Sequence, residues 1–211
     1  KILRHNYREE DPYSLGKGSV FELYRDSRNI MWIGTHMGGL EYYEPKDDHF
    51  HAYKHNPDNP SSIAKNDVRA IDEDEKGNLW LAVHGKGVDY FNRKTESFRH
   101  YNNKNSGLSN DWVFDVLYTR EKELWVASAW GLSLLEKGKN QFKIYTYNEN
   151  DLSSISNNEV ICLFEDSRGI IWAGTADGLN KYNPETDNFT RYQKGFNNTN
   201  ICSIEEDRQN R

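Results

Sequence analysis

The sequence predicts an all-β fold built from β-propeller blades of four antiparallel strands each. Four tryptophans recur with the same surroundings at spacings of 48, 45 and 47 residues: Trp32, Trp80, Trp125 and Trp172. Each repeat holds four short stretches rich in β-branched and aromatic residues, separated by Gly, Asn, Asp and Pro. No window of twelve residues shows the 3.6-residue period of an amphipathic helix. Four strands in a repeat of this length are typical of a propeller blade.

The strands of one repeat are expected in a fixed order. An apolar pair three residues apart opens the first strand, and the repeated Trp lies in the second. A Gly-apolar step such as Gly87-Val88 opens the third strand, and a Phe-x-x-Tyr pattern marks the fourth. An acid follows the apolar pair in three repeats, and Thr119 takes its place in the other. For the second repeat these features predict strands over residues 68–72, 78–83, 88–92 and 97–101.

The repeat boundaries divide the whole chain as a single propeller fragment. We expect about four whole blades plus two partial ones, with the four repeated tryptophans filling the gaps between adjacent sheets as a structural core. The predicted divisions are the tail of a preceding blade (1–19), repeats 1 to 4 (20–67, 68–112, 113–159 and 160–200), and the start of a truncated fifth repeat (201–211).

Composition and charge narrow the function classes. The 211 residues carry 27 Lys and Arg against 33 Asp and Glu, so the net charge of −6 argues against a nucleic-acid surface. Aromatic residues make up 13% of the chain, which suits a packed core rather than a disordered chain. No apolar run approaches the roughly 20 residues of a membrane helix, and no signal-peptide pattern opens the chain. Cys162 and Cys202 are too few for a disulfide framework.

One repeat carries a resemblance to a known family. The run Asp151-Leu-Ser-Ser-Ile-Ser-Asn-Asn-Glu-Val160 leads into Glu165-Asp166-Ser-Arg-Gly-Ile-Ile-Trp172-Ala-Gly-Thr175. It closely resembles the two-component regulator propeller repeat, and the other repeats match with small departures. The resemblance implies a periplasmic sensor region of a hybrid two-component system from glycan-degrading gut bacteria, and a histidine kinase in the parent protein. Seven blades, as the family implies, need on the order of 320 residues, so the chain is expected to be a fragment.

Candidate ligand-binding residues lie in loops where the repeat is least uniform. In a propeller blade the loop between the second and third strands and the loop joining two blades open on the same face. Trp112 and Trp130 are tryptophans outside the repeat pattern, and such a pair suits stacking on a sugar ring, with polar neighbours binding its hydroxyls. The alternative is that both pack against the next blade or a neighbouring domain. The further candidates are Asn110, Asp111, His36, His84, Lys86 and Asp177.

Catalytic and metal sites are not predicted. His36 and His84 occupy the same repeat position, but no third ligand with metal-site spacing accompanies them. A glycosidase needs two carboxylates facing each other across the sugar bond, and no pair stands out among the loop acids. The sequence therefore predicts no catalytic residue, no metal and no cofactor, and hence no enzyme.

The function expected from these observations is a sensor or ligand-binding scaffold. We expect it to bind an oligosaccharide derived from a glycan and to regulate polysaccharide use through its parent. The expected partners are that oligosaccharide and a second parent copy in a dimer, with no nucleic acid and with membrane contact only through a helix of the parent. One alternative is a purely structural or dimerisation propeller whose parent binds its ligand elsewhere. A glycan-cleaving hydrolase or lyase propeller is another.

Overall fold

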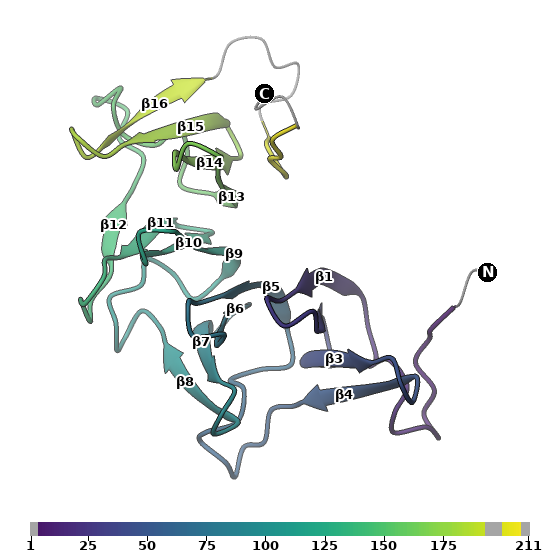
Figure 1. Ribbon diagram of the computed structural model, residues 1–211. Coiled ribbons are helices and arrows are strands. Elements are labelled where there is room, and N and C mark those ends of the chain that lie inside the picture. Colours follow the sequence, from purple (N-terminus) through teal and green to yellow (C-terminus); the bar gives the residue numbers. More distant parts are fainter. Residues whose placement is uncertain (1–3, 193–199, 208–211) are drawn as a thin grey trace. The chain divides into compact units, whose positions relative to one another are not determined.

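A computed structural model describes residues 4–192 and 200–207 of the chain. Within these ranges the chain forms four antiparallel sheets of four strands, each in sequential order, which confirms the predicted fold class (Figure 1). The first two sheets are β1–β4 and β5–β8, with the strands Val20–Arg25, Met31–Thr35, Leu40–Glu44, His49–Tyr53, Val68–Glu73, Leu79–Val83, Gly87–Asn92 and Ser97–Tyr101. The other two are β9–β12 and β13–β16, with the strands Val113–Tyr118, Leu124–Ser128, Gly131–Leu135, Lys143–Tyr145, Val160–Glu165, Ile171–Thr175, Gly178–Asn183 and Asn188–Tyr192.

The predicted strands of the second repeat agree with β5 to β8 to within one residue at every boundary. At the other end of the chain, Ile201–Asp207 forms no strand. Residues 208–211, the rest of the predicted fifth repeat, lie outside the described residues. The Ile201–Asp207 segment nevertheless contacts the last blade, because Ile201 N donates to Thr175 O (3.0 Å) and Ser167 N donates to a Glu206 carboxylate oxygen (2.9 Å).

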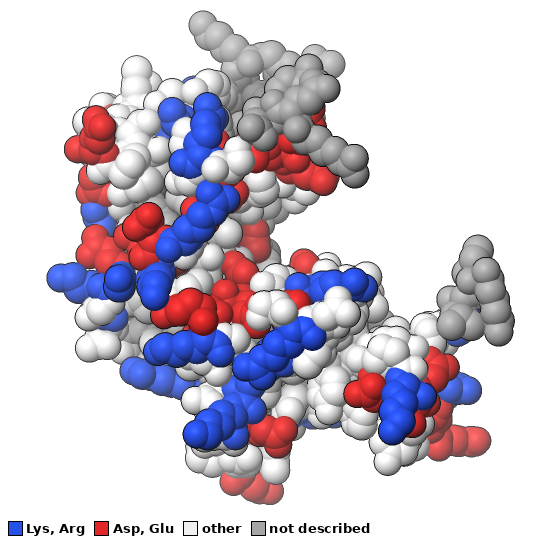
Figure 2. Space-filling view, in the orientation of Figure 1, with Lys and Arg blue, Asp and Glu red and all other residues white. Residues whose placement is uncertain are grey.

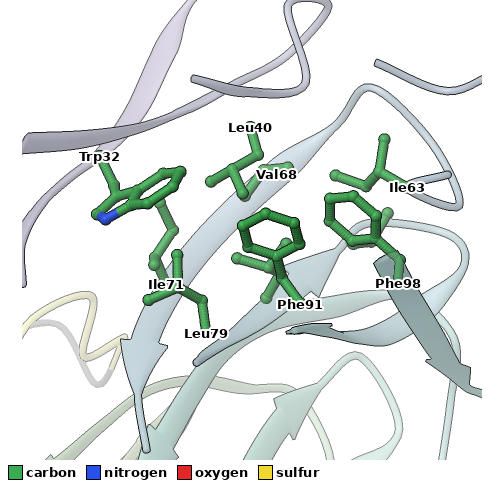
Figure 3. Packing of buried hydrophobic residues seen from close by; sticks show 10 residues of the cluster. Trp32, Leu40, Ile63, Val68, Ile71, Leu79, Phe91 and Phe98 are labelled. Carbon is green, nitrogen blue, oxygen red and sulfur yellow. The ribbon is translucent and has the colours of Figure 1, made fainter. Parts of the chain in front are cut away.

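The chain divides into two compact units, Lys1–His100 and Tyr101–Arg211. In the first unit the hydrophobic core lies between the two sheets (Figure 3). Trp32 from β2 is 3% exposed, and its ring lies 6.0 Å from that of Phe91 in β7. Ile71 of β5 and Leu79 of β6 pack in the same cluster. The tryptophan therefore fills the gap between adjacent sheets in this unit.

The second unit repeats this packing with different residues. Trp125 of β10 is fully buried and packs in one cluster with Val160, Leu163 and Ile171 of the following sheet. Trp80 is also buried, whereas Trp172, in the last sheet, is only partly buried. In each unit the Trp of the first sheet thus becomes core because the second sheet of the same unit covers it.

The repeated aspartate explains the turn between the first two strands of a blade. Asp166 Oδ1 accepts hydrogen bonds from the backbone N of Arg168 and Ile170, and Oδ2 accepts one from Trp172 Nε1 (3.1 Å). Burial opposes ionisation of this carboxyl, but these hydrogen bonds outweigh it and lower its pKa to about 2. In the first blade, Asp26 holds its turn and Trp32 Nε1 (2.9 Å) in the same way.

A second set of buried polar side chains, on the third strand of each blade, holds the segments that join the blades. Each of these side chains accepts a hydrogen bond from a backbone N of the joining segment, at 2.7 to 3.0 Å. Their shared position is directly after the Gly-apolar step of the repeat. The pairs are Gly16 to Glu41, Ala64 to Asp89, Ser109 to Ser133, and Ser156 to Asn180.

In the second blade a histidine contacts the buried acid of this set, and the contact makes the stability of the fold depend on pH. His100 Nδ1 lies 2.6 Å from Asp89 Oδ1, and its Nε2 lies 2.9 Å from Pro60 O. The hydrogen bond with Asp89 raises the pKa of His100 above its ordinary 6.5, although burial opposes the shift. The imidazolium therefore stabilises the fold fully below pH 6.5, and this contribution is lost as the pH rises through the folded pKa.

We expect His100→Gln to remove this pH dependence. In urea titrations between pH 5.5 and 9, the wild-type free energy of unfolding should decline at the alkaline end relative to that of the variant. His51→Gln is the control, because His51 contacts aromatic rings rather than a carboxylate. If the free energies of unfolding of wild type and His100→Gln differed by a constant amount over this pH range, the prediction would be wrong.

Candidate functional site

The candidate residues come together at one end of each sheet because a backbone hydrogen bond ties two loops there. The first residue after the second strand donates its N–H to the carbonyl of the residue directly before the first strand. The four bonds are His36 to Ser19, His84 to Asp67, Ala129 to Trp112, and Ala176 to Glu159, at 2.9 to 3.0 Å. The second-to-third loop and the blade-joining loop therefore lie side by side in every blade. We call this edge of a sheet its loop end.

Trp112 and Trp130 both lie at the loop end of the β9–β12 sheet. Their side chains are 59% and 64% exposed, in contrast to Trp125 in the same sheet, which is fully buried. Trp112 belongs to the joining loop, and Trp130 follows Ala129, whose N–H binds the Trp112 carbonyl. Two large aromatic surfaces are thus presented to solvent by adjacent loops of one rigid sheet, which is the arrangement that a stacking platform needs.

The polar candidates beside Trp112 and Trp130 form hydrogen bonds with the backbone of the loops that carry them. Asn110 Oδ1 accepts a hydrogen bond from Trp112 N (2.7 Å), and Asp111 Oδ1 accepts one from Asn103 N (2.8 Å). Trp130 N donates to Ser128 Oγ (3.3 Å), which anchors the other loop. In the next blade, Asp177 occupies the loop end of the β13–β16 sheet, where its N–H donates to Thr175 Oγ1 (3.1 Å). Asn110 and Asp111 therefore position Trp112.

The remaining candidates, His36, His84 and Lys86, belong to the other unit. His36 Nδ1 lies 3.3 Å from Asp67 Oδ2, so the loop end of one blade contacts the joining loop of the next. His84 and Lys86 share the loop between β6 and β7. The structure thus groups the candidates into two sets, one in each compact unit. Sequence reasoning missed Lys65 and Arg69, which flank Asp67 and carry no repeat signal.

The face shown in Figure 2 carries mixed charge, and the described residues hold no metal cluster. On the face shown in Figure 2, Lys and Arg side chains alternate with Asp and Glu. Within residues 4–192 and 200–207, no three His, Cys, Asp or Glu side chains are grouped so that they could hold a metal ion. The same residues contain no helix of the length and hydropathy needed to span a bilayer.

The fold and the repeat define a class of protein, a run of β-propeller blades. The family described as "Two component regulator propeller" matches residues 14–37 and 154–177. Two segments of the chain therefore match the two-component regulator propeller repeat, which confirms the resemblance seen in its sequence.

Solved structures have a similar fold. The extracellular domain of a hybrid two component system from B. thetaiotaomicron is 26% identical, with a TM-score of 0.82 over 98% of this chain and 27% of that chain. The extracellular domain of a one component system from the same organism is 18% identical, with a TM-score of 0.74 over 90% of this chain and 26% of that chain. The chain thus spans about a quarter of the length of these two proteins.

More distant structures share the fold alone. Virginiamycin B lyase from Staphylococcus aureus in complex with quinupristin is 13% identical, with a TM-score of 0.66 over 87% of this chain and 59% of that chain. A search among curated proteins found no significant match.

Proposed function

We propose that this chain is part of the extracytoplasmic sensor region of a hybrid two-component signalling protein. The two matched repeats support this proposal, as does the similarity to an extracellular domain of such a system over 98% of the chain. In the parent protein the region lies in the periplasm. Ligand binding there shifts an equilibrium between two arrangements of a dimer, and a kinase across the membrane reads the shift.

The ligand that fits best is an oligosaccharide bound at the loop end of the β9–β12 sheet. The observation that carries this assignment is the pair of exposed tryptophans, Trp112 and Trp130, on adjacent loops of one blade. Contiguous exposed apolar patches on soluble proteins often mark binding sites. The apolar face of a pyranose ring stacks on an indole, and the amide and carboxylate groups nearby bind hydroxyl groups.

Trp130→Ala tests this function. We expect calorimetry with the 211-residue chain to detect binding of at least one member of a panel of neutral and acidic oligosaccharides. The variant should bind the same sugar at least about fivefold more weakly, because a stacked aromatic contributes about 1 kcal/mol or more. Leu152→Ala is the control, since Leu152 is 80% exposed in the same unit and lies outside the loop end.

Two results would contradict the assignment. One is an unchanged dissociation constant in Trp130→Ala. The other is a folded chain that binds no member of the panel, which would favour a structural or dimerisation role.

A further inference from the structure

A second group of residues lies around Asp67 at the loop end of the β5–β8 sheet. The Asp67 side chain is only 3% exposed and has three basic neighbours. Arg69 Nε donates to its Oδ1 (2.9 Å), while Lys65 Nζ and His36 Nδ1 lie 3.6 and 3.3 Å from its Oδ2. One buried carboxylate thus organises a lysine, an arginine and a histidine. We call these four residues the Asp67 cluster.

The Asp67 cluster carries more positive than negative charge. Lys65 and Arg69 together contribute two positive charges against one on Asp67, before any proton on His36 is counted. Lys86 lies in the adjacent β6–β7 loop and adds a third cation at the same loop end. The Lys65 side chain reaches this loop, because Lys65 Nζ donates to His84 O (3.0 Å). These residues therefore give the loop end an excess of positive charge.

The basic groups are held in place and yet accessible. The Arg69 guanidinium lies over the Phe21 ring, with Cζ 3.8 Å from the ring centroid, and the Phe21 ring contacts His36 edge-on at 6.0 Å. Asp67 engages the guanidinium through Nε, and among the described residues no acceptor binds its Nη atoms. The side chains of Lys65 and His36 are 46% and 50% exposed. A guanidinium edge that is held in position beside an ammonium group is suited to donate hydrogen bonds to a carboxylate or a sulfate.

We propose that the Asp67 cluster, with Lys86, binds the anionic group of an acidic saccharide, either a uronate carboxylate or a sulfate ester. This proposal deepens the proposed function, on which it rests for the saccharide nature of the ligand. Asp67 is a positioning residue here: it orients Arg69, Lys65 and His36, and the excess positive charge binds the oxyanion. Phe21, which is 39% exposed beside Arg69, offers an apolar surface for the sugar ring.

Calorimetry with three trisaccharide or tetrasaccharide probes tests the proposal on the 211-residue chain. Trigalacturonate carries carboxylates only, a carrageenan tetrasaccharide carries sulfates only, and galactotriose is neutral. We expect one of the two acidic probes to bind at least about tenfold more tightly than galactotriose, with an affinity that falls as salt rises. The probe that binds identifies the anionic group.

The double variant Lys65→Gln/Lys86→Gln should weaken binding of that acidic probe by roughly tenfold or more, because each charged hydrogen bond is lost. Both side chains are exposed and Asp67 keeps Arg69, so the fold is preserved, which far-UV circular dichroism checks. Lys94→Gln is the matched control, since Lys94 lies in the β7–β8 turn at the opposite end of the same sheet.

The outcomes separate this proposal from the proposed function. Equal affinity for acidic and neutral probes, or an acidic probe whose affinity the double variant leaves unchanged, overturns the anion site. The absence of binding by either acidic probe at millimolar concentration overturns it as well. If galactotriose binds and Trp130→Ala abolishes that binding, the proposed function stands while the anion site falls.

Discussion

Arg93→Met should lower the free energy of unfolding by about 3–5 kcal/mol, because it leaves buried carboxylates without their counter-ion. Arg93 Nη1 lies 2.8 Å from Asp26 Oδ2 and 3.6 Å from Glu73 Oε1, and its side chain is only 10% exposed. The guanidinium also lies 5.2 Å from the Trp32 ring centroid. A single side chain of the second blade thus neutralises acids from both sheets of the first unit.

Arg168→Met is the matched control for this prediction. Arg168 Nη2 also lies 2.9 Å from the repeated aspartate of its blade, Asp166, but its side chain is 65% exposed. A pair whose cation is exposed to water contributes about 0–1 kcal/mol, and the buried Asp166 keeps its hydrogen bonds from Ile170 N and Trp172 Nε1. The control should therefore change stability by no more than that. Urea titration followed by far-UV circular dichroism measures both variants. Equal losses of stability in the two variants would show that burial of the arginine does not determine how much the ion pair stabilises the fold.

Trp125→Ala should be comparably destabilising, by about 3–5 kcal/mol, because it opens a cavity where two sheets of the second unit meet. Trp125 is fully buried, and its ring stacks on Tyr145 (5.7 Å between centroids) and meets Tyr182 edge-on (4.8 Å). Partial collapse cannot fill the space of an indole between two rigid sheets. The midpoint of urea unfolding, read by circular dichroism, should fall accordingly.

The same substitution at Trp130 provides the control, since Trp130 lies in the next loop and is 64% exposed. Its replacement by Ala should change stability by no more than about 0.5 kcal/mol. A large loss of stability in Trp130→Ala would mean that this side chain supports the fold, and it would remove the premise of the binding test.

The repeat allowed most of the fold to be predicted. A Trp in the second strand, a Gly before the third and a Phe-x-x-Tyr in the fourth are local signals, and each depends on the pleat or turn of its own strand. Gly39, directly before β3, and Gly131, the first residue of β11, have φ values of 87° and 123°, where a side chain would be strained. Strand positions therefore followed from sequence to within a residue in the second repeat.

The candidate site was only partly predictable. Trp112 and Trp130 stood out because they break the repeat, and the structure brings them to one loop end. Lys65 and Arg69 gave no such signal, since isolated basic residues in loops are common. Their importance depends on Asp67, whose burial at 3% exposure concentrates three basic groups around one carboxylate. Burial of that kind is a property of packed blades rather than of any short segment.

The sequence by itself determined the blade, because strand period, turn residues and the repeated Trp act within some 45–48 residues. Tertiary structure alone decided which polar groups became buried partners. Arg93 meets Asp26 across two sheets, and Asp67 meets His36 of the preceding blade. The physical reason is that such pairs join residues distant in sequence, and their strength depends on the water that the packed sheets exclude.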